Sequence, residues 1–348
     1  MLAIYVSILC YILFILYFFF TFQKQGLSKG ICYILSFVVS LPALHLRNAL
    51  FLFEGQWILL SLCGRVFYHP VIKRAHTTYL FIPISFLLAA SLTIYGIYNM
   101  SHIVRISYDV TSSVHLERSY NIALLADLHY PVSMKNGGLN TLITRLQNEK
   151  PDFVVLAGDI VDEYTTSEER AEVFQAFGSL TTQCPVFYVC GNHDAADYAA
   201  KDSLSVQSLY QEIEQNRIHV LSDEIYSFNE ELTLVGRTDY RFQDRKTLPE
   251  LLSNVDSSKY TMVFDHQPRD LEEANAYAVD LHLSGHTHAG QIFPMYAIYE
   301  LFHINELNYG RKDFETMTAI NTSGAAGWGF PVRTDHHSEY VMIHIHSK

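Results

Sequence analysis

Residues 285–291 read Gly-His-Thr-His-Ala-Gly-Gln and directly follow the largely apolar run 278–283. The glycines that bracket the histidines let the backbone turn sharply, so that His286 and His288 can aim both imidazoles into one small volume. A His-x-His pair of this kind is also compatible with a solvated turn. By itself the stretch therefore indicates a metal-binding loop at the end of a strand without deciding it.

Four more polar clusters lie upstream, and each follows an apolar, strand-like run in the same way. They are Asp127-Leu128-His129, Gly158-Asp159-Ile160-Val161-Asp162, Gly191-Asn192-His193-Asp194 and Asp265-His266-Gln267-Pro268. In α/β domains, ligands bind outside the carboxyl ends of the strands. Five clusters at strand ends therefore predict one shared site.

The side chains in these clusters match the ligands that a pair of divalent ions about 3.5–4 Å apart requires. Asp159 is the natural bridge, because a carboxylate has two oxygens and can neutralise both ions. The other ligands divide into Asp127, His129 and His288 for one ion and Asn192, His266 and His286 for the second. Such mixed ligation suits manganese, iron or zinc better than calcium or magnesium.

Two residues beside these ligands are candidates for the chemistry itself. A water held between two divalent ions is acidified enough to attack phosphorus at neutral pH. His193 is not needed as a ligand and could stabilise the phosphoryl oxygens or protonate a leaving group. Asp194 could orient that imidazole or could cap a turn, and the sequence leaves both roles open.

Helical and strand-like patterns alternate from residue 121 onward. Helices are predicted at 138–148, 167–177, 206–216, 248–252 and 270–278. Further strands are predicted at 218–221, 225–228, 232–235, 317–321 and 340–346, and a short strand pair at 103–108 and 114–117 leads into the region. This interleaving predicts a layered α/β domain with the site at the strand ends.

The first 100 residues differ from the rest in charge and hydropathy. They hold six basic residues and one acid, about +5, whereas the remainder holds 18 basic and 35 acidic residues, about −17. Residues 2–22 and 78–98 are long and apolar enough to cross a bilayer of about 30 Å. Residues 31–46 are a short candidate, and 48–62 are ambiguous because Glu54 would be costly at mid-bilayer.

We therefore expect a transmembrane region of three or four helices over 1–100, a connecting segment over 101–120 and a catalytic domain over 121–348. Residues 2–22 have no basic flank before them and no small-residue cleavage site, which favours a retained anchor over a signal peptide. The basic loop 65–76 favours the cytoplasm. The acidic domain after the last span is thus predicted to be extracytoplasmic, on a multi-pass protein of the cell membrane.

The charge distribution also bears on partners. A strongly acidic domain would repel a phosphate backbone, which argues against nucleic acid as a partner. The expected partners are a phosphate-ester substrate, possibly lipid-linked, and the membrane lipids around the spans. The sequence points to no protein partner.

Taken together, the five clusters resemble the motifs of the calcineurin-like metallophosphoesterase family, in the expected order and over residues 121 to about 340. The resemblance is greatest to the bacterial membrane-anchored YkuE-type subfamily, although Ala289 stands where many members have glycine. It implies a four-layered α-β-β-α sandwich, a dinuclear metal centre and hydrolysis of phosphodiesters or phosphomonoesters. Carried over by position, it implies the same ligand assignment, with His193 assisting transfer.

Some features of the resemblance leave alternatives open. Asp162 is implied to fix its loop through hydrogen bonds to backbone N–H groups. Arg333 could bind a substrate phosphate as a fork-shaped donor or could form a structural ion pair. The alternative to a membrane-anchored phosphoesterase is a catalytically silent scaffold or sensor in the membrane. Silent members typically lose a ligand or the assisting histidine, and here none is missing.

Overall fold

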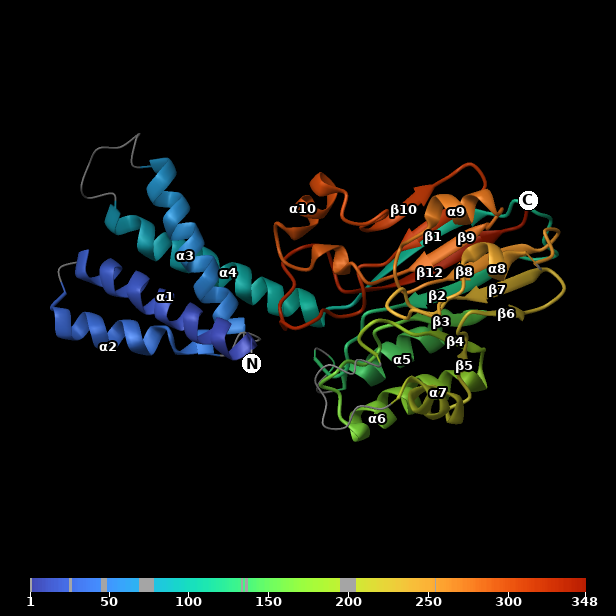
Figure 1. Cartoon of the computed structure of the whole chain (residues 1–348), viewed down its shortest axis with the longest axis horizontal. Coiled ribbons are helices and arrows are strands. Elements are labelled where there is room, and N and C mark those ends of the chain that lie inside the picture. Colours follow the sequence, from blue (N-terminus) through green and yellow to red (C-terminus); the bar gives the residue numbers. More distant parts are fainter. Residues whose placement is uncertain are drawn as a thin grey trace. The chain divides into compact units, whose positions relative to one another are not determined.

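The computed structural model describes residues 2–24, 27–44, 49–68, 78–132, 134, 137–194, 205–253 and 255–348. The chain divides into two compact units, shown in Figure 1. The helical unit comprises Met1–Tyr98 and the short segment Gly329–Thr334, and the α/β unit comprises Asn99–Trp328 and Asp335–Lys348.

The helical unit is built from four α-helices and one 3-10 turn. They are α1 (Leu2–Lys24), α2 (Lys29–Val39), η1 (Leu41–Leu44), α3 (Ala49–Tyr68) and α4 (Thr78–Ser101), the last of which continues into the α/β unit. Among the described residues, two helices are long and apolar enough to cross a membrane, at Tyr5–Lys24 and Pro83–Ser101. The apolar helices Lys29–Val39 and Ala49–Gly64 are shorter. Three or four spans thus stay a prediction, and residues 69–77 of the basic loop lie outside the described residues.

Two six-stranded sheets form the α/β unit. The first has the order β1 (Val104–Thr111), β12 (Glu339–His346), β2 (Tyr120–Leu125), β3 (Phe153–Ala157), β4 (Val186–Val189), β5 (His219–Val220). The second has the order β10 (Gly310–Asp313), β11 (Thr318–Asn321), β9 (Leu281–Ser284), β8 (Tyr260–Phe264), β7 (Leu232–Gly236), β6 (Glu224–Ser227). Strands β2, β3 and β4 are parallel, as are β7, β8 and β9, so within each set the carboxyl ends share one edge.

The sheets pack face to face, and helices cover their outer faces. Phe153 of β3 and Phe264 of β8 meet in the core between the sheets, with ring centroids 6.3 Å apart. The outer face of the first sheet carries α5 (Gly138–Glu149), α6 (Ser167–Gly178) and α7 (Val206–Gln215), and that of the second carries α8 (Leu248–Leu252) and α9 (Leu271–Ala276). This confirms the predicted α-β-β-α layering. Strands such as β3 are buried on both faces, which explains their continuous apolar sequence.

The predicted strand pair at the start of the α/β unit is wrong. Residues 114–117 form no strand, because the Ser112 hydroxyl donates to Val114 O and accepts from Val114 N, which makes a turn. β1 instead pairs in parallel with the C-terminal strand β12. The predicted helix 167–177 is present as α6, and the residue before it caps it. Thr166 caps α6 in a capping box with Glu169.

Candidate metal centre

Two groups of metal-type side chains lie at the carboxyl ends of the central strands. One consists of Asp127, His129 and His288, and the other of Asp159, His266 and His286. Within each group the potential ligand atoms all lie within 4.8 Å of one another. These residues follow β2, β3, β8 and β9, so the parallel strands bring together segments that are far apart in the sequence.

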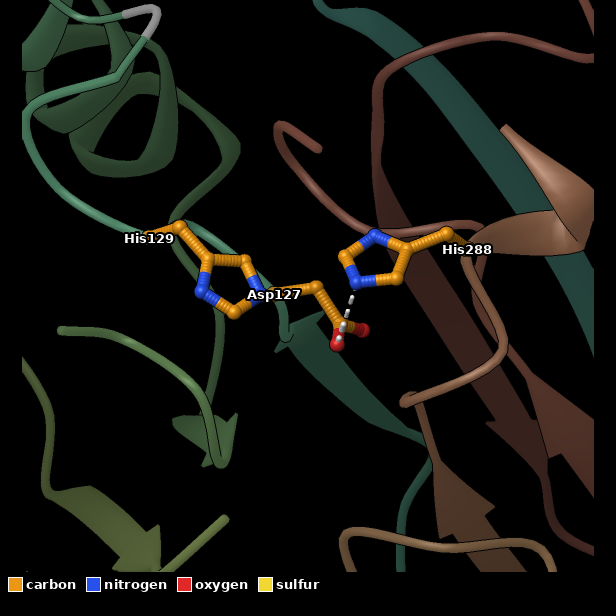
Figure 2. Close-up of side chains that lie close together, drawn as sticks. All are labelled: Asp127, His129 and His288. Carbon is orange, nitrogen blue, oxygen red and sulfur yellow. Dashed lines mark ion pairs between the residues drawn. The ribbon is translucent and has the colours of Figure 1, made fainter. Parts of the chain in front are cut away.

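In the first group the imidazoles of His129 and His288 lie on either side of the Asp127 carboxylate, as Figure 2 shows. His288 Nε2 lies 3.6 Å from Asp127 Oδ1, and the two imidazole rings are 5.2 Å apart. His129 is fully buried, and neither of its ring nitrogens has a hydrogen-bond partner. Burial lowers the pKa of His129 to about 4, so the ring is neutral at pH 7. A buried neutral imidazole without partners is costly, and a metal ion would satisfy it.

In the second group, four potential ligand atoms converge. His266 Nδ1 lies 2.9 Å from the carbonyl oxygen of Ala157, a contact in which the ring donates and thereby turns Nε2 toward the site. Nε2 lies 3.2 Å from Asp159 Oδ2, 3.1 Å from Asn192 Oδ1 and 3.2 Å from His286 Nδ1. One proton on Nε2 could serve only one of these neighbours. The donor set therefore fits a cation better than it fits a proton.

Asp159 links the two groups. Its Oδ2 lies 3.2 Å from His266 Nε2 in one group and 3.7 Å from His129 Nε2 in the other, and its Oδ1 accepts the backbone N–H of His193 at 2.7 Å. Burial opposes ionisation of Asp159, yet the charge of His266 holds the pKa of Asp159 well below its ordinary value. Burial likewise lowers the pKa of His266, but the charge and hydrogen bond of Asp159 outweigh this effect and raise that pKa well above its ordinary value. The centre thus favours positive charge.

The loops that present the ligands have an unusual backbone. Five of the predicted ligands have positive φ, namely Asp127 (53°), His129 (42°), Asp159 (53°), His286 (75°) and His288 (51°). Non-glycine residues in this region are strained, and such strain clusters at functional sites. Glycines make room for the carboxylates: a Cβ on Gly191 would lie 2.2 Å from Asp159 Oδ1, and one on Gly285 would lie 2.4 Å from Asp127 Oδ2.

His193 has a carboxylate partner that the sequence analysis missed. Glu163 Oε2 lies 3.0 Å from His193 Nδ1. Burial lowers the pKa of His193, but the hydrogen bond and charge of Glu163 and the charge of Asp159 outweigh this effect. The pKa of His193 is therefore raised above its ordinary value. The Trp328 ring lies 5.0 Å from the His193 ring on another side. Glu163 follows Asp162 directly, so its place in a ligand-bearing loop was the one available signal.

The hydrogen bonds that the structure resolves for the Asp194 carboxylate come from backbone N–H groups and not from an imidazole. Its two oxygens accept four N–H groups, from Asp159, Ile160, Val161 and Gly191, at 2.7–3.0 Å. Of the two roles left open by the sequence, these contacts support the cap. Asp194 therefore shapes the loop that carries the Asp159 carboxylate.

The remaining predicted residues fall in different places. Asp162 accepts the backbone N–H of Tyr164 at 2.8 Å, and its Oδ2 lies 3.8 Å from His129 Nδ1. Ala289 adopts a left-handed conformation with φ of 46°. Arg333 is fully buried and belongs to the helical unit, where its backbone N–H donates to the carbonyl of Gly96 at 2.9 Å.

Behind His266 lies a buried cluster of charges that the sequence did not indicate. Asp265, the residue before His266, has no exposed surface and contacts Arg237 at 3.3 Å and Arg245 at 2.7 Å. Both guanidinium groups also reach Asp270. Because Asp265 is held between two arginines, the strand end that presents His266 is fixed in position.

Comparisons with known proteins agree with this geometry. The family model described as calcineurin-like phosphoesterase matches residues 120–290. An uncharacterized metallophosphoesterase of Aquifex aeolicus is 32% identical over 215 residues, which cover 59% of this chain and 77% of the relative. The uncharacterized metallophosphoesterase YkuE of Bacillus subtilis is 28% identical over 186 residues, covering 51% of this chain and 61% of YkuE.

A relative with a membrane region also matches. A transmembrane protein with metallophosphoesterase domain from Danio rerio is 24% identical over 277 residues, covering 75% of this chain and 61% of the relative. Together with the two apolar helices, this match suggests membrane association. The chain covers 60–61% of the length of several other curated relatives that it matches. By these matches the chain belongs to the calcineurin-like metallophosphoesterase family, and this membership implies metal-dependent hydrolysis of phosphate esters.

Proposed function

We propose that this protein is a membrane-anchored hydrolase of phosphodiesters or phosphomonoesters that works with two divalent metal ions. The observation that carries the proposal is the position of Asp159 between His129 of one ligand group and His266 of the other. A carboxylate shared by two imidazole-bearing groups is the arrangement that a dinuclear centre needs. The mixed ligands favour manganese, iron or zinc.

Two divalent ions bound by these residues would supply Lewis-acid activation of a water molecule and of the phosphate oxygens. Positioning and proton transfer would fall to the residues of the chain. The backbone N–H of His193 is fixed on Asp159, and its imidazole is fixed by Glu163, so the ring is held beside the ligands. From there it could donate a proton to the leaving oxygen or stabilise charge on the phosphoryl group.

We further propose that the substrate is a membrane- or envelope-associated phosphate ester and that the α/β unit lies outside the cytoplasm. The two membrane-length helices support anchoring, and the basic residues between 65 and 76 support this orientation. The acidic balance of residues 101–348 disfavours nucleic acid. A lipid headgroup, a lipid-linked sugar phosphate or a cell-wall diester all satisfy these conditions.

The test is hydrolysis of bis-p-nitrophenyl phosphate and p-nitrophenyl phosphate by the full chain in detergent, with added Mn²⁺. The parent is compared with Asp159→Ala and with the control Asp256→Ala, which changes an exposed carboxylate on a turn. We expect turnover in the parent and in the control, and loss of turnover with a chelator or in Asp159→Ala. The ratio of the two rates distinguishes diester from monoester preference.

The opposite result would favour the silent-scaffold alternative. If the parent binds two equivalents of Mn²⁺, Fe²⁺ or Zn²⁺ and still hydrolyses neither compound nor a panel of phospholipids, the proposal of a phosphoesterase is overturned. If no metal binds at all, the assignment of the two ligand groups is overturned.

A further inference from the structure

Helix α10 (Met295–Phe302) and the residues around it expose an apolar surface, here called the α10 surface and defined as Phe293, Leu301, Phe302 and Ile304. Their side chains are 71%, 72%, 67% and 55% exposed. No residue of α10 is buried, although the helix is predominantly apolar. A helix of a soluble α/β domain normally buries such residues, and a contiguous exposed group marks an interaction surface.

The α10 surface is joined directly to the loop that carries His286 and His288, here called the metal loop. Only six residues separate His288 from Met295, the first residue of α10. Gly290 has φ of 81°, and a Cβ there would lie 2.3 Å from the backbone nitrogen of Tyr296 in α10. The first turn of α10 therefore packs backbone to backbone against the loop that carries His286 and His288. Whatever α10 contacts is held near the metal centre.

Charge decides what kind of partner fits this surface. Across residues 292–304 the only acidic or basic side chain besides His303 is Glu300, whose carboxylate accepts a hydrogen bond from Asn308 at 2.7 Å. Two tyrosines, Tyr296 and Tyr299, lie among the apolar residues. Tyrosine is enriched at membrane–water interfaces, and burying an apolar surface with so few charges in a bilayer removes little charge from water.

Chain connectivity ties the start of β1 to a membrane-length helix. Helix α4, the second of the membrane-length helices, ends at Ser101, and β1 begins at Val104. These three residue steps extend at most about 11 Å. The chain also joins the helical unit again at Gly329, one residue after Trp328. The link from Ser101 to Val104 thus ties the α/β unit covalently to a helix that could cross a membrane, and the segment Gly329–Thr334 belongs to the same helical unit.

We propose that the α10 surface inserts into the surface of the phospholipid bilayer in which the protein is anchored. The inference rests on the proposed anchoring and extends the proposed function, because it brings the metal loop to phosphate esters that lie in the membrane surface. It does not depend on catalysis. The α10 surface acts as a contact that orients the centre, whereas the apolar helices act as the tether.

The experiment uses the full chain in lipid nanodiscs made with ordinary or brominated phosphatidylcholine, which quenches tryptophan on contact. Leu301→Trp and Phe302→Trp are compared with Tyr277→Trp, an exposed residue just after α9. The emission added by each new tryptophan is obtained by subtracting the parent, which contains two tryptophans. We expect brominated lipid to quench the added emission of Leu301→Trp and Phe302→Trp at least twofold and to leave that of Tyr277→Trp unchanged.

Unquenched, solvent-like emission from both α10 variants would overturn the proposal. Emission that is shifted to the blue but is not quenched would also overturn it, because a second copy of the chain would then cover the surface. Turnover of bis-p-nitrophenyl phosphate by the same samples is recorded separately. A protein that binds two equivalents of metal, hydrolyses neither nitrophenyl compound nor the phospholipid panel and has quenched α10 tryptophans would refute the proposed function while supporting this inference. An active protein with unquenched tryptophans would do the reverse.

Discussion

Asp194 Oδ2 accepts a 2.7 Å hydrogen bond from the backbone N–H of Asp159, the residue that lies between the two ligand groups. The same carboxylate accepts three more backbone N–H groups from the loops that follow β3 and β4. Asp194 thus joins the loop that carries Asp159 to the loop that carries Asn192. Its role is to position the ligands.

Replacing Asp194 by Asn should therefore weaken both folding and metal binding. Asparagine keeps the shape but turns one acceptor oxygen into a donor, so that two buried N–H groups lose their acceptor, at about 1–3 kcal/mol each. The total of about 2–6 kcal/mol should lower Tm by about 4–24 °C, given about 2–4 °C per kcal/mol for a domain of this size. The amount of Mn²⁺ that the purified protein retains should also fall.

The measurement is thermal unfolding of the full chain in detergent, together with metal analysis after gel filtration. Asp256→Asn is the control, because Asp256 is exposed and the side-chain hydrogen bonds resolved for its carboxylate come from nearby Ser258. An Asp194→Asn protein with the parental Tm and metal content would show that the four hydrogen bonds do not support the centre.

Gly191→Ala should move the Asp159 carboxylate without removing any candidate ligand. The new Cβ would lie 2.2 Å from Asp159 Oδ1 and 2.4 Å from Asp159 N, and neither the carboxylate nor the backbone can accommodate it in place. Changes to groups that orient a ligand typically cost roughly 10–100-fold in metal affinity. We expect the Mn²⁺ concentration needed for half-maximal activity to rise by about that factor. Gly55→Ala, where a Cβ meets no atom within 4 Å, should leave it unchanged. Equal Mn²⁺ requirements in the two variants would contradict this account.

The candidate ligands could be found in the sequence because each lies where an apolar strand ends and a polar cluster begins. Apolar runs such as 153–156 and 260–264 are long enough to identify buried strands, and the polar cluster begins where each run stops. Parallel pairing then brings the strand ends to one edge. Local pattern and the general rule for strand ends together placed Asp159 and His266 at one site.

The features that escaped prediction depend on contacts between distant residues. Glu163 lies 30 positions before His193, and its place directly after Asp162 does not by itself reveal that it contacts this histidine. β1 pairs with β12, from the far end of the chain, and a single sequence does not reveal which strands pair. Helix α10 buries no face, so its apolar residues gave no core-facing pattern to recognise.

Glu163 should matter for the rate of the reaction more than for substrate binding. Its carboxylate holds His193 through Nδ1, and general acid catalysis is typically worth 10²–10⁴-fold when the acid is well placed. Glu163→Gln keeps an oxygen that can accept the Nδ1–H but lacks the charge, whereas Glu163→Ala removes the contact. We expect kcat to fall about 10-fold in the first and at least about 100-fold in the second, with KM within about threefold of the parent.

Steady-state kinetics on bis-p-nitrophenyl phosphate at saturating Mn²⁺ separates these effects. Glu168→Gln, on the exposed first turn of α6, serves as the control and should behave like the parent. A parental kcat in both Glu163 variants, or an effect confined to KM, would exclude the proposed positioning of His193.

His282 should make the α/β unit sensitive to acid. It is fully buried on β9, and neither ring nitrogen has a hydrogen-bond partner. Burial lowers its pKa to about 4; the charges of Asp265 and Asp270 oppose this shift, and those of Arg237 and Arg245 add to it. The unfolded chain, with a pKa near 6.5, therefore binds a proton that the folded chain excludes between about pH 6.5 and 4.

Stability must accordingly fall as the pH drops through that window, because the unfolded state binds more protons there. By pH 5 this one histidine should cost the folded state about 2 kcal/mol, or roughly 4–8 °C in Tm. His282→Leu removes the titrating group and should reduce the difference in Tm between pH 7 and pH 5 by that amount. His115→Leu, which changes an exposed histidine, should keep the parental difference. If His282→Leu retains the full acid sensitivity of the parent, the buried imidazole is not its source.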